Sequence, residues 1–308
     1  MSKLIVTPAP HIKDSDTVSK QMRNVFIALI PALIASVIFF GTNALVVIIT
    51  TVLSSVLFEV IILKIRKKAI KKSDISSSAL TGLLLAFCVS SFMPWWIMIL
   101  ASFIAIAVAK HAFGGLGFNI FNPALAARAF ILASWPVLMT TWLAPYAAIT
   151  SATPLELLKE NGISADYLTM FIGNHAGSIG ETSAIALLIG ALYLLVTRTI
   201  DFRVPASYLI TVVAMSLVMG QDIVFQLLAG GLILGAFFMA TDPVTSPVTK
   251  PGRWVFGAGC GFITMIIRVW GGYPEGVCYS ILIMNAVVPL LDRYLQGRIF
   301  GCKRWNVV

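Results

Sequence analysis

Ten apolar stretches, separated by short polar segments, constrain the fold of this chain more than any other feature. Apolar residues make up 58% of the 308 residues and charged residues only 11%, a composition unlike that of soluble domains. A bilayer core requires about 20 apolar residues per spanning helix. The predicted spans cover about 24–40, 44–63, 78–92, 94–109, 122–140, 181–197, 205–219, 221–239, 254–270 and 275–292.

This pattern predicts an all-α polytopic membrane protein with about ten transmembrane helices. Several spans are shorter than the bilayer is thick, so we expect tilted or broken helices. We expect a cytoplasmic segment at 1–23 and a single transmembrane domain at 24–308, with an outer-face segment at about 142–180. No apolar run precedes the first span within the first 20 residues, so we expect no cleavable signal peptide.

The basic residues predict the orientation. If the N-terminus is cytoplasmic, 19 of the 22 basic residues fall in inner segments. Only Lys159 and Arg268 fall outside, and Arg128 lies within a span. We therefore expect a multi-pass protein of the cytoplasmic membrane with both termini inside. Because topology accounts for the positive charge and no nucleic-acid motif is present, we expect no nucleic-acid partner. The four cysteines form no C-x-x-C pair and the three histidines are scattered, so we expect no metal site.

Two segments rich in glycine and proline, 113–128 and 240–253, interrupt the helices beside the membrane. Irregular backbone at membrane depth survives where it is buried in protein or lines a polar cavity, which predicts a ligand or ion site. The alternative is two ordinary inner loops, in which Asn122-Pro123 and Asp242-Pro243 each begin a helix as N-cap and first residue. The matching starts also suggest an internal repeat.

Five charged side chains lie in or near spans. An arginine within a span, such as Arg128, faces a polar partner, a cavity or an anionic ligand, unless it extends to the inner interface. Asp222, Asp242 and Glu275 lie near span ends, where they are interfacial caps or cation ligands. For Glu59 we expect an ion pair or an interfacial position.

The segment Thr153-Pro154-Leu155-Glu156 has the pattern of a capping box. It predicts a short helix from Pro154 to about Glu160, ended by Asn161-Gly162. Unpaired N–H groups at a helix start also suit a phosphate group. The preceding residues, Thr150-Ser151-Ala152-Thr153, resemble the site at which a flavin transferase esterifies a threonine with FMN. The two interpretations are compatible.

Three motifs together resemble one family, the NqrB/RnfD family, which contains the RnfD membrane protein of the Rnf complex and the NqrB membrane protein of the sodium-translocating NADH:quinone reductase. The resemblance covers nearly the whole chain, and the chain length favours the Rnf branch. The motifs are Gly117-Phe118-Asn119-Ile120-Phe121-Asn122-Pro123-Ala124-Leu125-Ala126-Ala127-Arg128-Ala129-Phe130, Ser151-Ala152-Thr153-Pro154-Leu155 and Phe237-Phe238-Met239-Ala240-Thr241-Asp242-Pro243-Val244.

The resemblance implies a covalent FMN on Thr153, within a motif that includes Ser151, and a non-covalent riboflavin near Asn119 and Asn122. Arg128 is expected to compensate negative charge on that second flavin. Thr241 and Asp242 are further candidates for contact with an ion or a flavin. One departure concerns Ala147, since many flavin-transferase targets carry aspartate at that position.

The resemblance also implies an activity: electron transfer between ferredoxin and NAD coupled to export of Na⁺ or H⁺. Because this chain has no cluster motif and no dinucleotide fingerprint, other Rnf subunits are expected to supply iron–sulfur centres, a second FMN and the NAD site. Membrane lipid is the remaining partner. The rival hypothesis is a non-redox transporter or channel, which broken helices fit equally well but which gives no role to the Ser-Ala-Thr motif.

Overall fold

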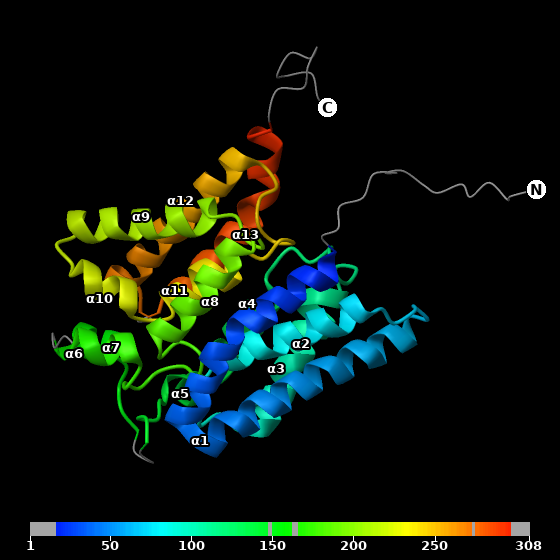
Figure 1. Cartoon of the computed structure of the whole chain (residues 1–308), viewed down its shortest axis with the longest axis horizontal. Coiled ribbons are helices and arrows are strands. Elements are labelled where there is room, and N and C mark those ends of the chain that lie inside the picture. The colour runs from blue at the N-terminus through cyan, green and yellow to red at the C-terminus, as the bar shows by residue number, and fades with distance from the viewer. Residues whose placement is uncertain (1–16, 147–149, 162–165, 273–274, 297–308) are drawn as a thin grey trace, which may run out of the picture.

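The computed structural model describes residues 17–146, 150–161, 166–272 and 275–296, and its named elements are all helices (Figure 1). In these residues the one β-type pairing is an isolated antiparallel bridge between Leu143 and Thr150. The all-α prediction is therefore confirmed. Residues Ala147 and Gly162, which entered the predictions for the flavin motif and for the end of the short helix, lie outside the described residues.

The first helix, α1 (Val18–Ile65), runs for 48 residues and folds back on itself at Gly41 (Figure 1). Gly41 has φ 60° and ψ −140°, a conformation that residues with a Cβ rarely adopt. The two arms correspond to the predicted spans at 24–40 and 44–63. The first arm starts at Val18, ahead of the boundary expected at residue 24, because Thr17 caps it by accepting from the Lys20 N–H.

The other predicted spans appear as helices, several of them short or broken. They are α2 (Lys72–Phe87), α3 (Trp95–Phe103) continuing into the π-helix η1 (Ile104–His111), α4 (Pro123–Ser134), α8 (Ala184–Val196), α9 (Arg203–Val218), α10 (Ile223–Leu228), α11 (Leu232–Leu234) continuing into the π-helix η2 (Gly235–Met239), α12 (Lys250–Trp270) and α13 (Val277–Tyr294). Among the described residues, α1 and α13 are long and apolar enough to cross a bilayer, and shorter apolar helices lie between them.

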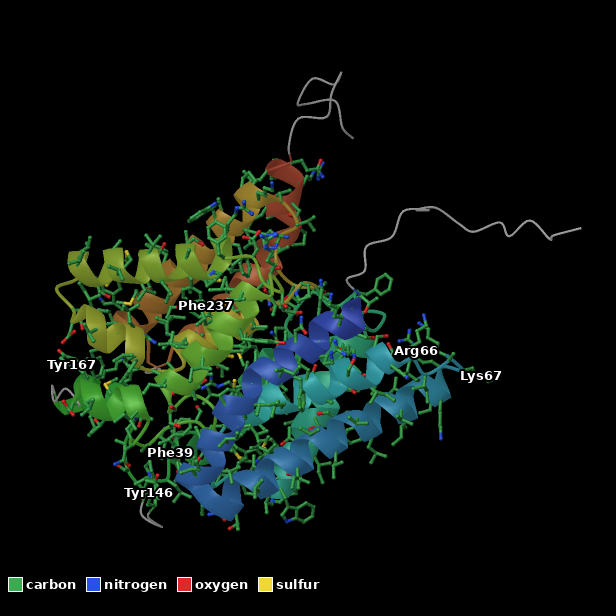
Figure 2. All side chains as sticks on the ribbon, viewed as in Figure 1. Phe39, Arg66, Lys67, Tyr146, Tyr167 and Phe237 are labelled. Carbon is green, nitrogen blue, oxygen red and sulfur yellow. The ribbon has the colours of Figure 1, made fainter. Side chains whose placement is uncertain are left out.

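The molecule has two dissimilar ends. Arg66 and Lys67, in the loop between α1 and α2, lie at one end, which we call the basic end (Figure 2). Phe39, Tyr146 and Tyr167 lie at the other (Figure 2). That end also holds the short helices α5 (Pro136–Thr140), α6 (Pro154–Asn161) and α7 (Tyr167–Ile172), and we call it the Thr153 end.

Buried hydroxyl groups join the helices inside the bundle. The Ser54 hydroxyl donates to Ser102 at 2.8 Å, which links α1 to α3. The Tyr208 hydroxyl lies 2.6 Å from Thr264 Oγ1 and 3.2 Å from Ser280 Oγ, which links α9 to α12 and α13. All five side chains are buried. Because each hydroxyl has a partner, these polar groups stabilise the packing of apolar helices instead of weakening it.

Candidate functional site

A cavity at the basic end brings together four of the residues singled out in the sequence. Asn119, Asn122, Thr241 and Asp242 all line it, although the two glycine- and proline-rich segments are far apart in the chain. The space between the atoms is about 770 Å³, part of it open to the outside. This figure includes solvent at the open mouth of the cavity, so the lining residues, and not the volume, describe what the cavity can hold.

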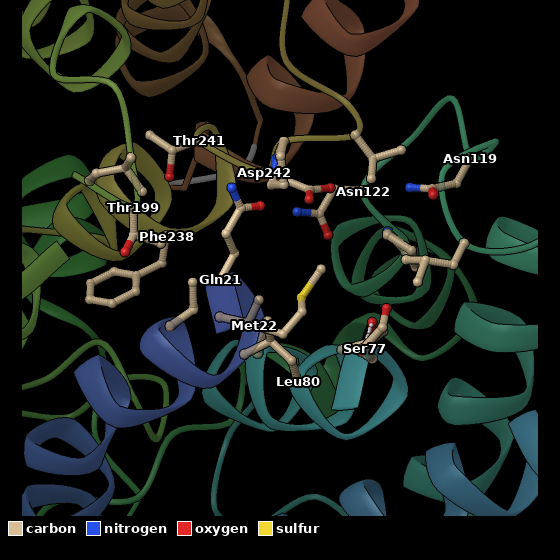
Figure 3. Close-up of a pocket in the computed structure, with 18 of the residues that line it drawn as sticks. Gln21, Met22, Ser77, Leu80, Asn119, Asn122, Thr199, Phe238, Thr241 and Asp242 are labelled. Carbon is tan, nitrogen blue, oxygen red and sulfur yellow. Dashed lines mark hydrogen bonds between the residues drawn. The ribbon is translucent and has the colours of Figure 1, made fainter. Parts of the chain in front are cut away.

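The walls of this cavity differ in polarity. Asn119, Asn122 and Asp242 lie on one side, and the other side carries the apolar Leu80 and Phe238 with the hydroxyl-bearing Ser77 and Thr199 beside them (Figure 3). A planar ligand with a polar edge and an apolar ring system is the chemical class that such walls accommodate.

Asn122 has a structural role as well. Its Oδ1 accepts the N–H groups of Ala124 and Leu125 at 3.1 and 3.4 Å, so it caps α4 as predicted. Its Nδ2 donates to the carbonyl of Met239 at 3.3 Å, and Met239 is the last residue of η2. This bond joins the two interrupted segments, which both follow a π-helix. The cap and the cavity wall are therefore the same side chain.

The helix start predicted at Asp242-Pro243 was wrong. Asp242 does not begin a helix; the backbone stays irregular until Thr249 caps α12. Side chains of α12 and α13 hold the irregular backbone: Asp292 Oδ1 accepts from the N–H of Val248 at 3.0 Å, and Arg253 Nε donates to the carbonyl of Pro247 at 3.0 Å. These partners, which local sequence cannot indicate, replace the helix that Asp242-Pro243 suggested.

The remaining polar groups of the cavity are partly engaged. The Thr241 hydroxyl donates back to the carbonyl of Phe237 at 2.6 Å, and Thr245 donates to Asp242 Oδ2 at 3.1 Å. Asn119 Nδ2 donates to the carbonyl of Phe121 at 3.1 Å. Since its Oδ1 accepts no hydrogen bond from any described residue, Asn119 offers an acceptor to a ligand.

Lys110, which also lines the cavity, carries a buried ion pair. Its Nζ donates to Glu59 Oε2 at 2.9 Å, and each of these side chains is 1% exposed. His111 Nε2 lies 3.1 Å from the other carboxylate oxygen of Glu59, and Arg66 donates to the carbonyl of His111 at 3.1 Å. The ion pair predicted for Glu59 is confirmed, but it is fully buried and not interfacial.

Arg128 does not line this cavity, so the structure does not bring it together with Asn119 and Asn122. The guanidinium is 4% exposed and donates to Glu275, and it also lies 3.6 Å from Glu181. The alternative prediction, that the Arg128 side chain extends to the inner interface, is wrong because this side chain is buried. Glu275 pairs with this arginine and is not an interfacial cap. We call Arg128, Glu181 and Glu275 the carboxylate cluster.

The carboxylate cluster adjoins a break between α10 and α11. At this break Gly230 and Gly231 have positive φ angles of 64° and 66°. A Cβ on Gly231 would lie 2.3 Å from the Glu181 carboxyl carbon, so only glycine fits there. Arg268 donates to the carbonyls of Gln226 and Ala229 at 2.6 and 2.7 Å. This buried arginine thereby satisfies the backbone that the break leaves open.

Thr153 begins α6 through the predicted capping box. Its N–H donates to Glu156 Oε2 at 2.9 Å, and the N–H of Glu156 donates to Thr153 Oγ1 at 3.3 Å. Burial raises the pKa of the Glu156 carboxyl, although the Thr153 N–H opposes the rise. Thr153 is only 4% exposed.

The residues before Thr153 run extended and are anchored to Trp142. The Ser151 N–H donates to the carbonyl of Trp142 at 2.9 Å, next to the Leu143–Thr150 bridge. Ser151 itself is exposed. The motif is therefore presented as a short strand-like segment that leads into a helix start.

Thr153 and the carboxylate cluster share a small cavity. Glu181, Glu275 and His175 line it together with Thr153. His175 Nδ1 has no hydrogen-bond partner among the described residues, and burial lowers the pKa of this histidine to about 4, so the ring is neutral. Sequence reasoning missed His175 and Glu181, because a lone histidine in a loop and an acid at a span boundary carry no local signal.

Comparison with known proteins shows the family of this chain. The model of the NQR2, RnfD, RnfE family matches residues 5–301. The chain belongs to this family. It is 48% identical to the D subunit of the Na(+)-translocating ferredoxin:NAD(+) oxidoreductase complex of Acetobacterium woodii, over 97% of the chain and 95% of that protein.

Two further relatives are similar over the same share of the chain. The D subunit of the proton-translocating ferredoxin:NAD(+) oxidoreductase complex of Clostridium ljungdahlii is 46% identical, over 97% of the chain and 96% of that protein. The D subunit of the ion-translocating oxidoreductase complex of Aliivibrio salmonicida is 35% identical, over 97% and 99%. Relatives of nearly equal identity are thus named for different ions, so overall similarity does not select Na⁺ or H⁺.

Proposed function

We propose that this chain is the flavin-carrying membrane subunit of an ion-translocating ferredoxin:NAD oxidoreductase complex. Relatives that match nearly its whole length are named as the D subunits of such complexes. The observation that supports the flavin is the cavity at the basic end, which gathers Asn119, Asn122, Thr241 and Asp242 from two distant segments. A flavin supplies one- and two-electron chemistry, and the protein binds, orients and tunes it.

The lining of the cavity suits riboflavin in polarity. Asn119 offers an unused acceptor, and amide groups bond a flavin edge without adding charge. The apolar wall with Leu80 and Phe238 suits the ring system. The cavity also contains the cation of the buried Lys110–Glu59 pair, which takes over the charge-compensating role first expected of Arg128.

The second proposed cofactor is FMN, esterified to the Thr153 hydroxyl. In support, this hydroxyl lies at the N-terminus of α6, where the helix dipole favours a phosphate. Because Thr153 is buried in the folded chain, a transferase gains access to the hydroxyl only while residues 150–156 are displaced from the cluster.

Denaturing gels test the flavin directly. The chain is expressed with and without a flavin transferase, denatured, and examined for fluorescence under ultraviolet light. We expect a fluorescent band only with the transferase. A non-redox transporter or channel, the rival function, gives no band under either condition, and that outcome would overturn the redox proposal.

The proposed orientation places the Thr153 end outside the cell and the basic end in the cytoplasm. Thiol labelling tests this orientation. The native cysteines at positions 88, 260 and 278 are buried. Cys302 lies outside the described residues, and for the experiment it is first replaced by serine. Asp166→Cys, at an exposed position, is expected to react with a membrane-impermeant thiol reagent in intact cells. Lys68→Cys is expected to react only after the cells are opened. The reverse pattern contradicts the orientation.

A further inference from the structure

A second cavity opens at the basic end, beside the proposed flavin cavity, and arginine side chains surround it. Arg198, Arg203 and Arg253 line it together with Asp201, Thr199 and Ser246, and it holds about 1160 Å³ of space, much of it open to the outside. We call it the arginine cavity. Neither the family motifs nor the proposed cofactors assign it a role.

The arginine cavity carries unmatched positive charge. Arg203 and Arg253 both donate to Asp201 Oδ2, at 2.7 and 2.5 Å. Arg198 is exposed and makes no ion pair with any described residue. Three guanidinium groups therefore face one carboxylate, which leaves two positive charges unmatched. Burial alone would raise the pKa of Asp201, but the hydrogen bonds from Arg203 and Arg253 lower it. Asp201 is therefore ionised near neutral pH, and two positive charges stay unmatched.

Helix geometry adds to this charge. Arg203 is the first residue of α9, and Arg253 lies in the first turn of α12. The starts of both helices therefore lie at the cavity, where the helix dipoles favour an anion, although the N–H groups of Arg203 and Gly252 already donate to Asp201 and Thr249. A phosphate group matches the fork of donors that each arginine presents.

Exposed aromatic rings lie next to the arginines. Phe202 and Trp254 are 54% and 42% exposed, and their rings stack edge to face with centroids 6.5 Å apart. The Arg203 guanidinium lies over the Phe202 ring at 5.3 Å. Aromatic side chains beside basic residues at helix ends are typical of the level at which lipid headgroups meet acyl chains. A free phosphate would use the arginines but not this apolar rim.

We propose that the arginine cavity binds the phosphate headgroup of an anionic phospholipid, with its acyl chains against Phe202 and Trp254. Gln21, Thr199, Ile200, Thr241 and Pro243 line both this cavity and the flavin cavity. The headgroup therefore lies directly beside the proposed flavin cavity. The lipid site depends only on the residues named here, and it stands even if no flavin binds.

Native mass spectrometry of the full-length protein tests the proposal. The delipidated protein is incubated with equal amounts of dioleoyl phosphatidylglycerol and dioleoyl phosphatidylcholine, and bound lipids are counted. Each basic residue near an anionic headgroup contributes roughly a fivefold preference, so two unmatched charges predict a preference of about 25-fold for phosphatidylglycerol. Equal binding of the two lipids overturns the site.

Variants of the arginines test which residues produce the preference for phosphatidylglycerol. Arg198→Gln changes an exposed side chain that makes no ion pair with any described residue, so the fold is kept, and we expect the preference to fall about fivefold. Arg198→Gln combined with Arg253→Gln is expected to abolish it. The charge-matched control, Lys67→Gln with Lys68→Gln in the α1–α2 loop of the same end, is expected to keep it. A preference that survives the double arginine change contradicts the proposal.

A competition experiment distinguishes a bound lipid from a bound free phosphate. Inorganic phosphate at tens of millimolar is expected to displace little phosphatidylglycerol, and Trp254→Ser is expected to weaken lipid binding. Complete displacement by phosphate, with no effect of Trp254→Ser, assigns the cavity to a free anion and excludes the lipid.

Discussion

The two ends of the molecule solve the problem of buried polarity differently. At the basic end, neutral groups such as Asn122 and Thr241 line the cavity proposed for a flavin and bond largely to the backbone, and the buried ion pair there, Lys110–Glu59, is a pair of single charges. At the Thr153 end, the space is narrow, and charged side chains of the carboxylate cluster fill it. The first arrangement suits the non-covalent flavin proposed above, which neutral hydrogen bonds would hold. The second suits a cofactor that a covalent bond retains.

Thr153→Ala is the most decisive way to break this comparison. The variant lacks the hydroxyl that would carry the ester, so we expect complete loss of covalent flavin, measured by fluorescence of the denatured band. The protein is expected to stay in the membrane, since loss of a helix cap costs about 1 kcal/mol. Thr140→Ala, which changes an exposed threonine outside the motif, is the matched control and keeps its covalent flavin. Full fluorescence of Thr153→Ala would move the attachment site elsewhere.

Arg128→Gln probes the charges of the Thr153 end. It leaves the buried Glu181 and the half-buried Glu275 without their arginine, and removal of one partner from a buried ion pair costs about 3–5 kcal/mol. Thermal unfolding in detergent measures the loss. Lys110→Gln, at the basic end, is the comparison: it leaves a single carboxylate, Glu59, which keeps His111 nearby, so we expect a smaller loss. Equal losses would remove the distinction between the two ends.

Asn119→Leu sharpens the claim that neutral hydrogen bonds hold the second flavin. Loss of one such bond weakens binding by about fivefold, so flavin extracted without cleavage of a covalent bond is expected to fall. Covalent flavin at Thr153 is expected to stay unchanged. Thr241→Val serves as the control from the same cavity, because its hydroxyl already bonds to Phe237 and the shapes are similar. A loss in Thr241→Val as large as in Asn119→Leu would point to disturbed packing instead.

The smallest expected effect concerns the surface of the Thr153 end. Asp222 caps α10 by accepting from the Phe225 N–H at 3.1 Å and receives the Tyr167 hydroxyl, near the protein surface. Asp222→Ala is expected to lower stability by about 1 kcal/mol and to leave both flavins in place. Thermal unfolding and flavin content measure the two quantities together. A loss of flavin would show that α7 and α10 help to hold the Thr153 site.

Short sequence patterns predicted those parts of the site that are held by hydrogen bonds between residues close in the chain. Asn122 and Thr153 each cap a helix through partners within three residues, and such patterns are legible in sequence. Asp242-Pro243 shows the limit, because the same pattern failed where Asp292 and Arg253 supplied competing bonds from other elements. Arg128 shows it again: its need for a partner was predictable, but the identity of that partner was not.

By itself the sequence determined that the chain is a bundle of membrane helices, where most of these begin, and that its basic residues gather toward one side. Apolar runs and short-range caps act between neighbours, so no knowledge of packing is required. Only the tertiary structure decided which distant groups meet. Arg128 pairs with Glu275 across 147 residues, and Asn122 bonds to Met239 across 117. Such contacts depend on how the helices pack, because a buried polar group takes the partner that the fold brings within reach.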